Sequence, residues 1–228
     1  MNLLLSTPGR CGTHWLSWIL CEIFNLEHQK THRAANTPIA GGDRLYLSHD
    51  PPWLFRDSEL DIIIAMVRDP RDIVVSAAYY WASDLHGGQY DVLRDFWDLD
   101  LPDDATFDEA LHRLKTTGFN VRWFRSYIDH RNICQAVVRY EDLWRWPHRP
   151  LAETIVALGQ TVPASRVSQA LERYSFRRRS GGRDRGQQDT TSFYRRGIIG
   201  DWKNHFTPEE NEAFCKRFAW LLEPLGYS

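Results

Sequence analysis

A short loop near the start of the chain contains residue types that hold phosphate or sulfate. It runs from Ser6 to Trp15 and reads STPGRCGTHW, between an apolar run at 2–5 and an apolar helical pattern that begins at Thr13. Backbone N–H groups at a helix N-terminus, together with the positive end of the helix dipole, attract anions. Arg10 adds a guanidinium, which binds phosphate or sulfate oxygens in pairs. The loop predicts that the chain binds a phosphorylated nucleotide.

The loop by itself leaves a purely structural alternative open, because glycine-containing turns between a strand and a helix occur in many α/β proteins. The spacing from Gly9 to Gly12 is not that of a Walker A loop, and no Gly-Lys-Ser/Thr follows. This argues against an ordinary ATPase or GTPase.

A second candidate anion site lies at the end of the apolar run 61–67. Arg68 follows this run directly, and Ser76 lies eight residues later, about two turns into the next helix. An arginine and a hydroxyl at a strand end suit a second phosphate. The alternative is that Arg68 pairs with a local carboxylate and Ser76 is a packing hydroxyl.

A third candidate is the stretch from Arg173 to Arg196, which holds eight arginines and only two acids, Asp184 and Asp189. A mobile segment that closes over a polyanion is one interpretation. A solvated charge run and an RNA-binding loop are the others, and the lack of a basic stripe elsewhere weakens the last.

Alternating strands and helices must position these groups. The run 61–67 has the β-branched character of a central parallel strand, whereas 85–104 predicts a long loop. Helices are expected to begin near Thr13, Asp69, Thr106, Arg149, Ser165 and Thr207, and strands to cover 2–5, 44–49, 61–67 and 133–138. This order predicts one α/β domain over residues 1–228, in which a central parallel sheet is flanked by helices and ligands lie at the carboxyl ends of the strands.

The composition argues against a nucleic-acid-binding protein and against a protein that spans a membrane. The 228 residues carry a formal net charge of −2, which does not favour bulk nucleic-acid binding. No apolar run is long enough to span a membrane, and the first residues lack the features of a signal peptide. The four cysteines are scattered, as is usual for reduced thiols in a cytoplasmic protein.

The most specific motif lies near the C-terminus. Residues 193–207, which contain YRRGIIGDWKNHF, closely resemble the C-terminal signature of the soluble sulfotransferases, which use 3′-phosphoadenosine 5′-phosphosulfate (PAPS). The loop at 6–15 resembles the 5′-phosphosulfate loop of that family, and 68–76 resembles its 3′-phosphate motif. The three motifs occur in the family's order across nearly the whole chain. On this resemblance the chain is identified as a short, bacterial-type member.

The resemblance implies a P-loop-like phosphosulfate-binding loop after the first strand, with PAPS as donor, PAP as product and no metal. It implies that Trp15 stacks on adenine and that Arg68, Ser76, Arg196 and neighbours bind the 3′-phosphate. The implied cofactor-binding residues are Arg10, Cys11, Gly12, Thr13, His14, Trp15, Arg68, Ser76, Tyr140, Phe176, Arg195, Arg196 and Gly197.

His49 falls where the family keeps its general base. An imidazole takes a proton at neutral pH, so His49 is expected to deprotonate a hydroxyl or amine acceptor during in-line sulfuryl transfer. Arg10 is expected to stabilise the charge on the leaving phosphate. Acceptor walls are expected from Trp53, Tyr79, Tyr80, Trp81 and the 85–104 loop.

Four departures from the family pattern keep other functions open. Arg10 replaces a lysine, Cys11 a serine and His14 a threonine, and Leu47 stands where a lysine often precedes the histidine. The alternatives are a sulfotransferase for glycans or glycolipids and a regulatory protein that binds PAPS or PAP without transfer. A nucleotide or small-molecule kinase is disfavoured by the missing Walker lysine.

The sequence leaves the small-molecule acceptor and the oligomeric state open. Lys203, Thr207 and Glu212 fit the spacing of the family's dimer motif, but Pro208 occupies the usual valine position. A homodimer is therefore an open prediction.

Overall fold

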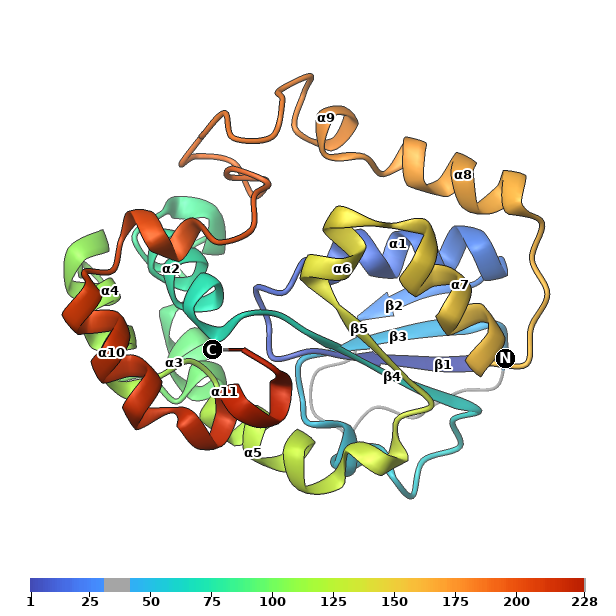
Figure 1. Cartoon of the computed structure of the whole chain (residues 1–228), viewed down its shortest axis with the longest axis horizontal. Coiled ribbons are helices and arrows are strands. Elements are labelled where there is room, and N and C mark those ends of the chain that lie inside the picture. Colours follow the sequence, from blue (N-terminus) through green and yellow to red (C-terminus); the bar gives the residue numbers. More distant parts are fainter. Residues whose placement is uncertain (31–41, 228) are drawn as a thin grey trace. The chain divides into compact units, whose positions relative to one another are not determined.

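The computed structural model describes residues 1–30 and 42–227, which fall into two units (Figure 1). The first, here called the sheet unit, comprises Met1–Arg68 and Arg122–Arg178. The second, the helical unit, comprises Asp69–Val121 and Arg179–Ser228. The expectation of one domain over 1–228 stays a prediction.

Five parallel strands form the sheet of the first unit, in the order β2-β3-β1-β4-β5. The strands are β1 (Asn2–Ser6), β2 (Glu27–Lys30), β3 (Arg44–Ser48), β4 (Ile62–Val67) and β5 (Ala136–Arg139). Ser6 at the end of β1 is paired with Ser48 of β3 and Ala65 of β4. The carboxyl ends of neighbouring strands therefore meet at one edge of the sheet, and the predicted α/β fold is confirmed.

Both faces of the sheet are covered. Leu4, Tyr46 and Ile63 share one face and form a buried cluster with Phe55 of η1 (Pro52–Phe55). Leu3 and Leu5 point to the opposite face, because side chains alternate along a strand. On the helical side, α1 (Thr13–Phe24) contacts β3, and α7 (His148–Ala157) contacts β5. The other helices of this unit are α5 (Val121–His130), η3 (Arg131–Ile133), α6 (Tyr140–Arg145), α8 (Ala164–Arg173) and α9 (Phe176–Arg179).

The strand expectations hold to within a residue for β1, β3 and β4. The strand expected at 133–138 begins later, at Ala136, because 131–133 forms the 3₁₀ turn η3. The strand β2 was not expected, since its residues Glu-His-Gln-Lys are polar and it lies at the edge of the sheet.

The described part of the helical unit is built from helices and turns. These are α2 (Pro70–Trp81), η2 (Asp84–His86), α3 (Tyr90–Trp97), α4 (Phe107–Thr117), η4 (Asp201–Asn204), α10 (Pro208–Arg217) and α11 (Ala219–Leu225). The expected helix starts are confirmed, because Asp69 caps α2 and both capping boxes, Thr106 with Glu109 and Thr207 with Glu210, form both of their hydrogen bonds.

Two expectations for this unit were wrong. The segment 85–104 is not a continuous loop, since it contains α3, and Trp97, Leu99 and Leu101 are buried. The helix expected from Thr207 to Gly226 is interrupted at Phe218, so that α10 and α11 are separate. Among the described residues, no helix has the length and apolar character needed to cross a bilayer.

Candidate functional site

Four neighbouring strands each end directly before a candidate site residue or within the candidate anion loop. Thr7, the second residue of that loop, follows β1, His49 follows β3, Arg68 follows β4, and Tyr140 follows β5. The strands are adjacent in the order β3-β1-β4-β5, so these residues share the carboxyl edge of one parallel sheet. This edge is where α/β sheets bind ligands.

The loop after β1 is wound through left-handed backbone conformations. The φ angles are +92° at Gly9, +54° at Arg10 and +77° at Gly12. Successive N–H groups in such a turn, followed by the N-terminus of α1, form a concave site for anions. At Gly12 a Cβ atom would lie 2.7 Å from the Tyr140 ring, so that only glycine fits. The loop therefore has the backbone geometry expected of a phosphosulfate site.

Arg68, which follows the neighbouring strand β4, forms a hydrogen bond with this loop. Its Nη1 donates to the carbonyl oxygen of Arg10 at 3.0 Å, and its guanidinium carbon lies 4.3 Å from the centre of the Tyr140 ring. Only 8% of Arg68 is exposed. Arg68 therefore places a buried positive charge beside the loop and stiffens it.

The remaining predicted residues of the sheet unit lie in or just before α1, apart from Phe176 in α9. Trp15 packs edge-to-face on Tyr140, with ring centres 6.0 Å apart, and His14 stacks on Trp18. Cys11 is fully buried, and burial raises the pKa of its thiol, which is therefore neutral. Phe176 is half-buried at the first position of α9. A neutral Cys11 side chain offers an anion only a weak S–H donor beside the backbone N–H.

His49 is anchored through one ring nitrogen. Its Nδ1 lies 3.0 Å from the Thr7 hydroxyl and 3.3 Å from the Thr7 carbonyl oxygen. The Thr7 hydroxyl lies in turn 2.9 Å from that of Thr13, the first residue of α1. The predicted base and the predicted anion loop are therefore connected by hydrogen bonds.

In the helical unit, Arg195 and Arg196 both pair with one buried carboxylate. Arg196 Nη1 lies 2.6 Å from Asp201 Oδ1, and Arg195 bonds the other oxygen. Burial by itself would raise the pKa of Asp201, but the hydrogen bond and charge of Arg195, with help from Arg196, lower it. Gly197 follows with φ +64°. Ser76 is half-buried in α2.

Two residues that the sequence analysis did not single out hold this arginine segment in place. Asp72 accepts hydrogen bonds from the backbone N–H groups of Gly200 at 2.8 Å and Trp202 at 2.9 Å. Arg183 donates to the carbonyl oxygens of Tyr194 at 2.7 Å and Arg195 at 3.0 Å. Asp72 lies inside the 3′-phosphate motif, so its position was a usable signal. Arg183 could not be separated from its seven neighbouring arginines by composition.

These contacts help to choose among the three interpretations of the arginine-rich stretch from Arg173 to Arg196. Arg183 has a structural role, whereas Arg177, Arg178, Arg179 and Arg185 are exposed, as a solvated run would be. Gly186 N donates to the Arg196 carbonyl at 2.8 Å, which closes the segment on itself.

Comparison with known proteins gives the family. Residues 41–226 match the family model described as the sulfotransferase domain. The chain belongs to the sulfotransferase family. Rat sulfotransferase 2A1 is 24% identical over 250 residues, which cover 95% of this chain and 83% of the relative. Human sulfotransferase 2B1 is 28% identical over 247 residues, which cover 95% of this chain and 65% of that protein.

Solved structures share the fold of this sulfotransferase. Mouse sulfotransferase SULT7A1, complexed with PAP, superposes with a TM-score of 0.68 at 20% identity, over 97% of this chain and 83% of that one. Retinol dehydratase, in a complex with retinol and PAP, gives a TM-score of 0.67 at 14% identity, over 97% and 81%. The predictions of the fold, of the family and of a sulfotransferase enzyme are therefore confirmed.

The residues expected to line the acceptor site of this sulfotransferase differ in how exposed their side chains are. Trp53 is covered on its ring by His130, at 4.0 Å between centres, and by the Arg56 guanidinium, at 4.5 Å. Trp81 has no exposed surface, and its Nε1 donates to the Pro102 carbonyl oxygen. A side chain with no exposed surface cannot touch an acceptor in this conformation, so Trp81 is not carried into the proposal below. Tyr80 is half-buried.

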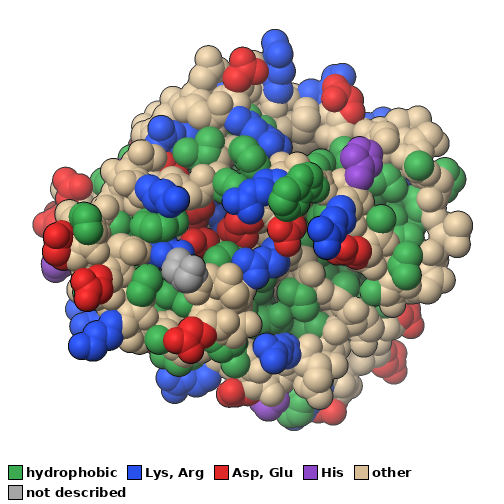
Figure 2. Space-filling model, in the orientation of Figure 1, with side chains coloured by type: hydrophobic (Ala, Val, Ile, Leu, Met, Phe, Trp, Pro, Cys, Tyr) green, Lys and Arg blue, Asp and Glu red, His purple; other side chains and the backbone are tan. Residues whose placement is uncertain are grey.

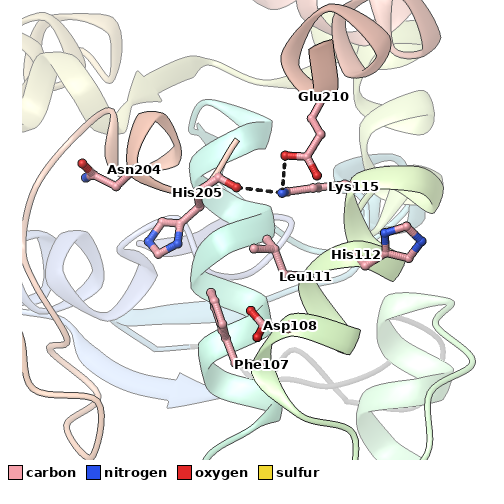
Figure 3. Close-up of a pocket in the computed structure, with 8 residues that line it drawn as sticks. All are labelled: Phe107, Asp108, Leu111, His112, Lys115, Asn204, His205 and Glu210. Carbon is pink, nitrogen blue, oxygen red and sulfur yellow. Dashed lines mark hydrogen bonds and ion pairs between the residues drawn. The ribbon is translucent and has the colours of Figure 1, made fainter. Parts of the chain in front are cut away.

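A pocket in the helical unit lies next to Tyr79, whose ring centre is 4.1 Å from that of Phe107 and 5.7 Å from that of His205. It has a volume of ≈390 Å³ (Figure 3), and Lys115 at its side donates to Glu210 Oε2 at 2.6 Å and to the His205 carbonyl oxygen at 2.7 Å. Its lining residues are Phe107, Asp108, Leu111, His112, Lys115, Asn204, His205 and Glu210. The ammonium group of Lys115 is paired within the protein, and none of the predicted site residues lines the pocket.

On the face of the molecule in Figure 2, Lys and Arg side chains lie among Asp and Glu side chains. This mixture differs from the continuous basic stripe typical of nucleic-acid-binding surfaces. Among the described residues, no group of three or more His, Cys, Asp and Glu side chains has the arrangement of a metal site.

Proposed function

We propose that this sulfotransferase transfers a sulfuryl group from PAPS to a hydroxyl or amine group of a small molecule. The observation that carries the proposal is the shared strand edge, which delivers the anion loop, Arg68, Tyr140 and His49 from four adjacent strands. The PAP that is bound in two solved structures of this fold supports the choice of nucleotide.

The residues of the sheet unit fit the 5′ end and the adenine of such a nucleotide. The left-handed residues Gly9, Arg10 and Gly12 give the loop the concave backbone that suits an anion. The close approach of Gly12 to Tyr140 lets a ring pack directly on the backbone. Within the described residues, the buried Trp15 Nε1 has no hydrogen-bond partner. Loop residues 10–15 would hold the phosphosulfate end, and Trp15, Tyr140 and Phe176 the adenine.

On the resemblance of the motifs, we assign the 3′-phosphate to Arg68 and to Ser76, Arg195, Arg196 and Gly197. Arg196 pairs with Asp201 through Nη1, but its buried Nε has no hydrogen-bond partner in the described part of the chain, so that N–H is available for a charge-assisted bond. When bound, PAPS supplies the sulfuryl group and leaves as PAP.

His49 is proposed as the general base. The ring is half-buried at the end of β3, and its Nδ1 is held by Thr7. An imidazole with an ordinary pKa near ~6.5 accepts a proton from a hydroxyl or amine at neutral pH. The acceptor oxygen or nitrogen would lose its proton to His49 as it bonds to sulfur.

Arg10 and the N-terminus of α1 are proposed to stabilise the leaving phosphate. Charge develops on the bridging oxygen as the S–O bond breaks, and fixed N–H donors and a guanidinium favour that charge. Arg10 has a left-handed backbone, which keeps its N–H within the turn. No divalent cation is part of the proposal.

One observation bears on the alternative of a protein that binds PAPS or PAP without transfer. Leu47, at the position where a lysine is common in the family, is 2% exposed in the sheet core. It therefore supplies no cation two residues before His49.

Calorimetric titration with PAP, and with AMP as the matched ligand, tests the nucleotide. PAP should bind more tightly by about 2 kcal/mol, roughly thirty-fold, because a buried phosphate gains charge-assisted bonds. Arg196→Met should remove most of this difference, whereas Arg149→Met, at an exposed arginine paired with Glu153, should not. Equal affinity for PAP and AMP in the unaltered protein would contradict the proposal.

A further inference from the structure

Three side chains form a hydrogen-bonded row from the end of β3 to the start of α1. His49 Nδ1 lies 3.0 Å from Thr7 Oγ1, which lies 2.9 Å from Thr13 Oγ1. Thr7 is fully buried and Thr13 is 5% exposed. In surroundings that exclude water, each of these bonds is strengthened and polarises the next.

The carbonyl oxygen of Thr7 decides where the ring hydrogen of His49 lies. A carbonyl oxygen only accepts hydrogen bonds, and it lies 3.3 Å from Nδ1. Nδ1 therefore carries the hydrogen and shares it between the carbonyl oxygen and the hydroxyl oxygen of Thr7. In the neutral ring, Nε2 is then the basic nitrogen.

The positions of the two hydroxyl hydrogens in this row follow from the number of hydrogen bonds that the Thr7 hydroxyl group can accept and donate. Thr7 Oγ1 accepts from the backbone N–H of Gly9 at 3.2 Å and from His49 Nδ1, which uses both of its lone pairs. Its own hydrogen must then be donated to Thr13 Oγ1. The hydroxyl hydrogen of Thr13 is consequently directed away from Thr7, at the N-terminus of the helix that follows the anion loop.

The backbone on both sides of His49 is held by β1. Thr7 N donates to the Ser48 carbonyl oxygen at 3.0 Å, and Ser6 Oγ donates to the Asp50 carbonyl oxygen at 2.7 Å. Trp123 Nε1 donates to Ser6 Oγ at 3.0 Å. His49 therefore has a fixed position relative to Thr7.

We propose that Thr7 is a positioning residue that fixes the tautomer of His49 and links the base to Thr13 of the anion loop. The inference rests on the proposed function. When the acceptor proton moves to His49 Nε2, the ring becomes positive and Nδ1–H becomes a stronger donor. Thr7 passes this polarisation to Thr13, whose hydroxyl then donates more strongly to the phosphate oxygen that receives the electron pair of the breaking S–O bond.

The variant Thr7→Val tests the link, because valine keeps the shape and the backbone carbonyl and removes the hydroxyl. We expect kcat to fall by about 10- to 100-fold, the size of effect that a misplaced catalytic group produces, with PAP affinity preserved. The pKa seen in the kcat profile should fall, because the protonated ring loses an acceptor. Thr7→Ser should rescue most of the lost rate. Thr161→Val, at an exposed threonine, is the matched control.

Two outcomes would overturn the inference. One is an unchanged kcat and pH profile in Thr7→Val. The other is a loss of PAP affinity that accounts for the whole loss of rate, which would make Thr7 a nucleotide-binding residue only.

A readout that needs no activity separates this inference from the proposed function. In ¹⁵N NMR of the His49 ring in the free protein, the Nδ1–H tautomer should dominate, and it should persist in Thr7→Val because this variant keeps the carbonyl oxygen that Nδ1–H bonds. A dominant Nε2–H tautomer in the unaltered protein would overturn the inference whether or not the protein transfers sulfate. Equal PAP and AMP affinity would instead contradict the proposed function.

Discussion

Two buried carboxylates, those of Asp72 and Asp201, form hydrogen bonds or ion pairs with the segment that contains Arg195, Arg196 and Gly197. Asp72 receives two backbone N–H groups of that segment, and Asp201 pairs with both of its arginines. Both carboxylates are 1% exposed. Because a buried charge is costly unless it is paired and hydrogen-bonded, these contacts restrict the segment to few conformations. The arginines are thereby ordered before a ligand arrives.

The role of His49 is tested by its amide analogue. His49→Gln removes the basic nitrogen, so kcat for transfer should fall by about 10²- to 10⁴-fold, the usual contribution of a general base. PAP affinity should be unchanged. The measurements are steady-state kinetics with any accepted substrate and calorimetry with PAP. His148→Gln, at an exposed histidine, is the control. Transfer at an unaltered rate in His49→Gln would show that another group takes the proton.

At the scale of elements, the conformation of the anion loop between β1 and α1 depends on how it packs against residues of other strands. The loop bends through three left-handed residues, and its last glycine packs against the Tyr140 ring, which follows β5. Arg68, after β4, donates to the loop carbonyl at Arg10. The shape of the loop therefore depends on two further strands of the sheet.

Gly12→Ala should destabilise the fold more than Gly88→Ala does. The φ angles are alike, +77° and +75°, so both variants pay about 1–2 kcal/mol for left-handed alanine. Only at position 12 does the new Cβ meet another residue, at 2.7 Å from Tyr140, which should add about 1–3 kcal/mol. Urea unfolding measures both values. Equal losses would mean that Tyr140 moves aside without cost.

At the scale of the whole molecule, residues far apart in the chain depend on one another for charge balance. The helical unit joins 69–121 to 179–228. Besides the Asp72 contacts, Arg71 lies over the Trp202 ring at 4.1 Å and donates to Asn211 at 3.1 Å. The stability of this unit should therefore follow the ionisation of its buried acids.

Asp201 should make the protein sensitive to acid. Its folded-state pKa lies below the ordinary value, so its stabilising contribution is complete above the ordinary pKa and is lost as pH falls through the folded value. Burial lowers the pKa of the neighbouring His205, which acts in the same direction because the folded state disfavours its protonation.

Asp201→Asn should lower the free energy of unfolding at pH 7 by about 2 kcal/mol, through the loss of charged hydrogen bonds. It should also flatten the decline of that free energy between about pH 5 and pH 3. Urea unfolding across this range measures both effects, with Glu153→Gln, at an exposed acid, as the control. An unchanged pH slope would mean that other acids govern acid unfolding.

Much of the fold and of the candidate site followed from local sequence pattern. The apolar runs located β1, β3 and β4, and the caps located the starts of α2, α4 and α10, because these signals depend on residues within a few positions. The amphipathic α3 was overlooked among glycines and Pro102, and the polar β2 had no apolar signal.

The sequence by itself determined the family, the order of the three motifs and the position of Arg68 directly after a strand, since these depend on side-chain types and spacing. Only the tertiary structure decided that Trp81 is buried, that Asp72 holds Gly200 and Trp202, and that Thr7 connects His49 to Thr13. Such contacts join residues up to 130 positions apart, and hydrogen-bond geometry between them exists only after the chain has folded.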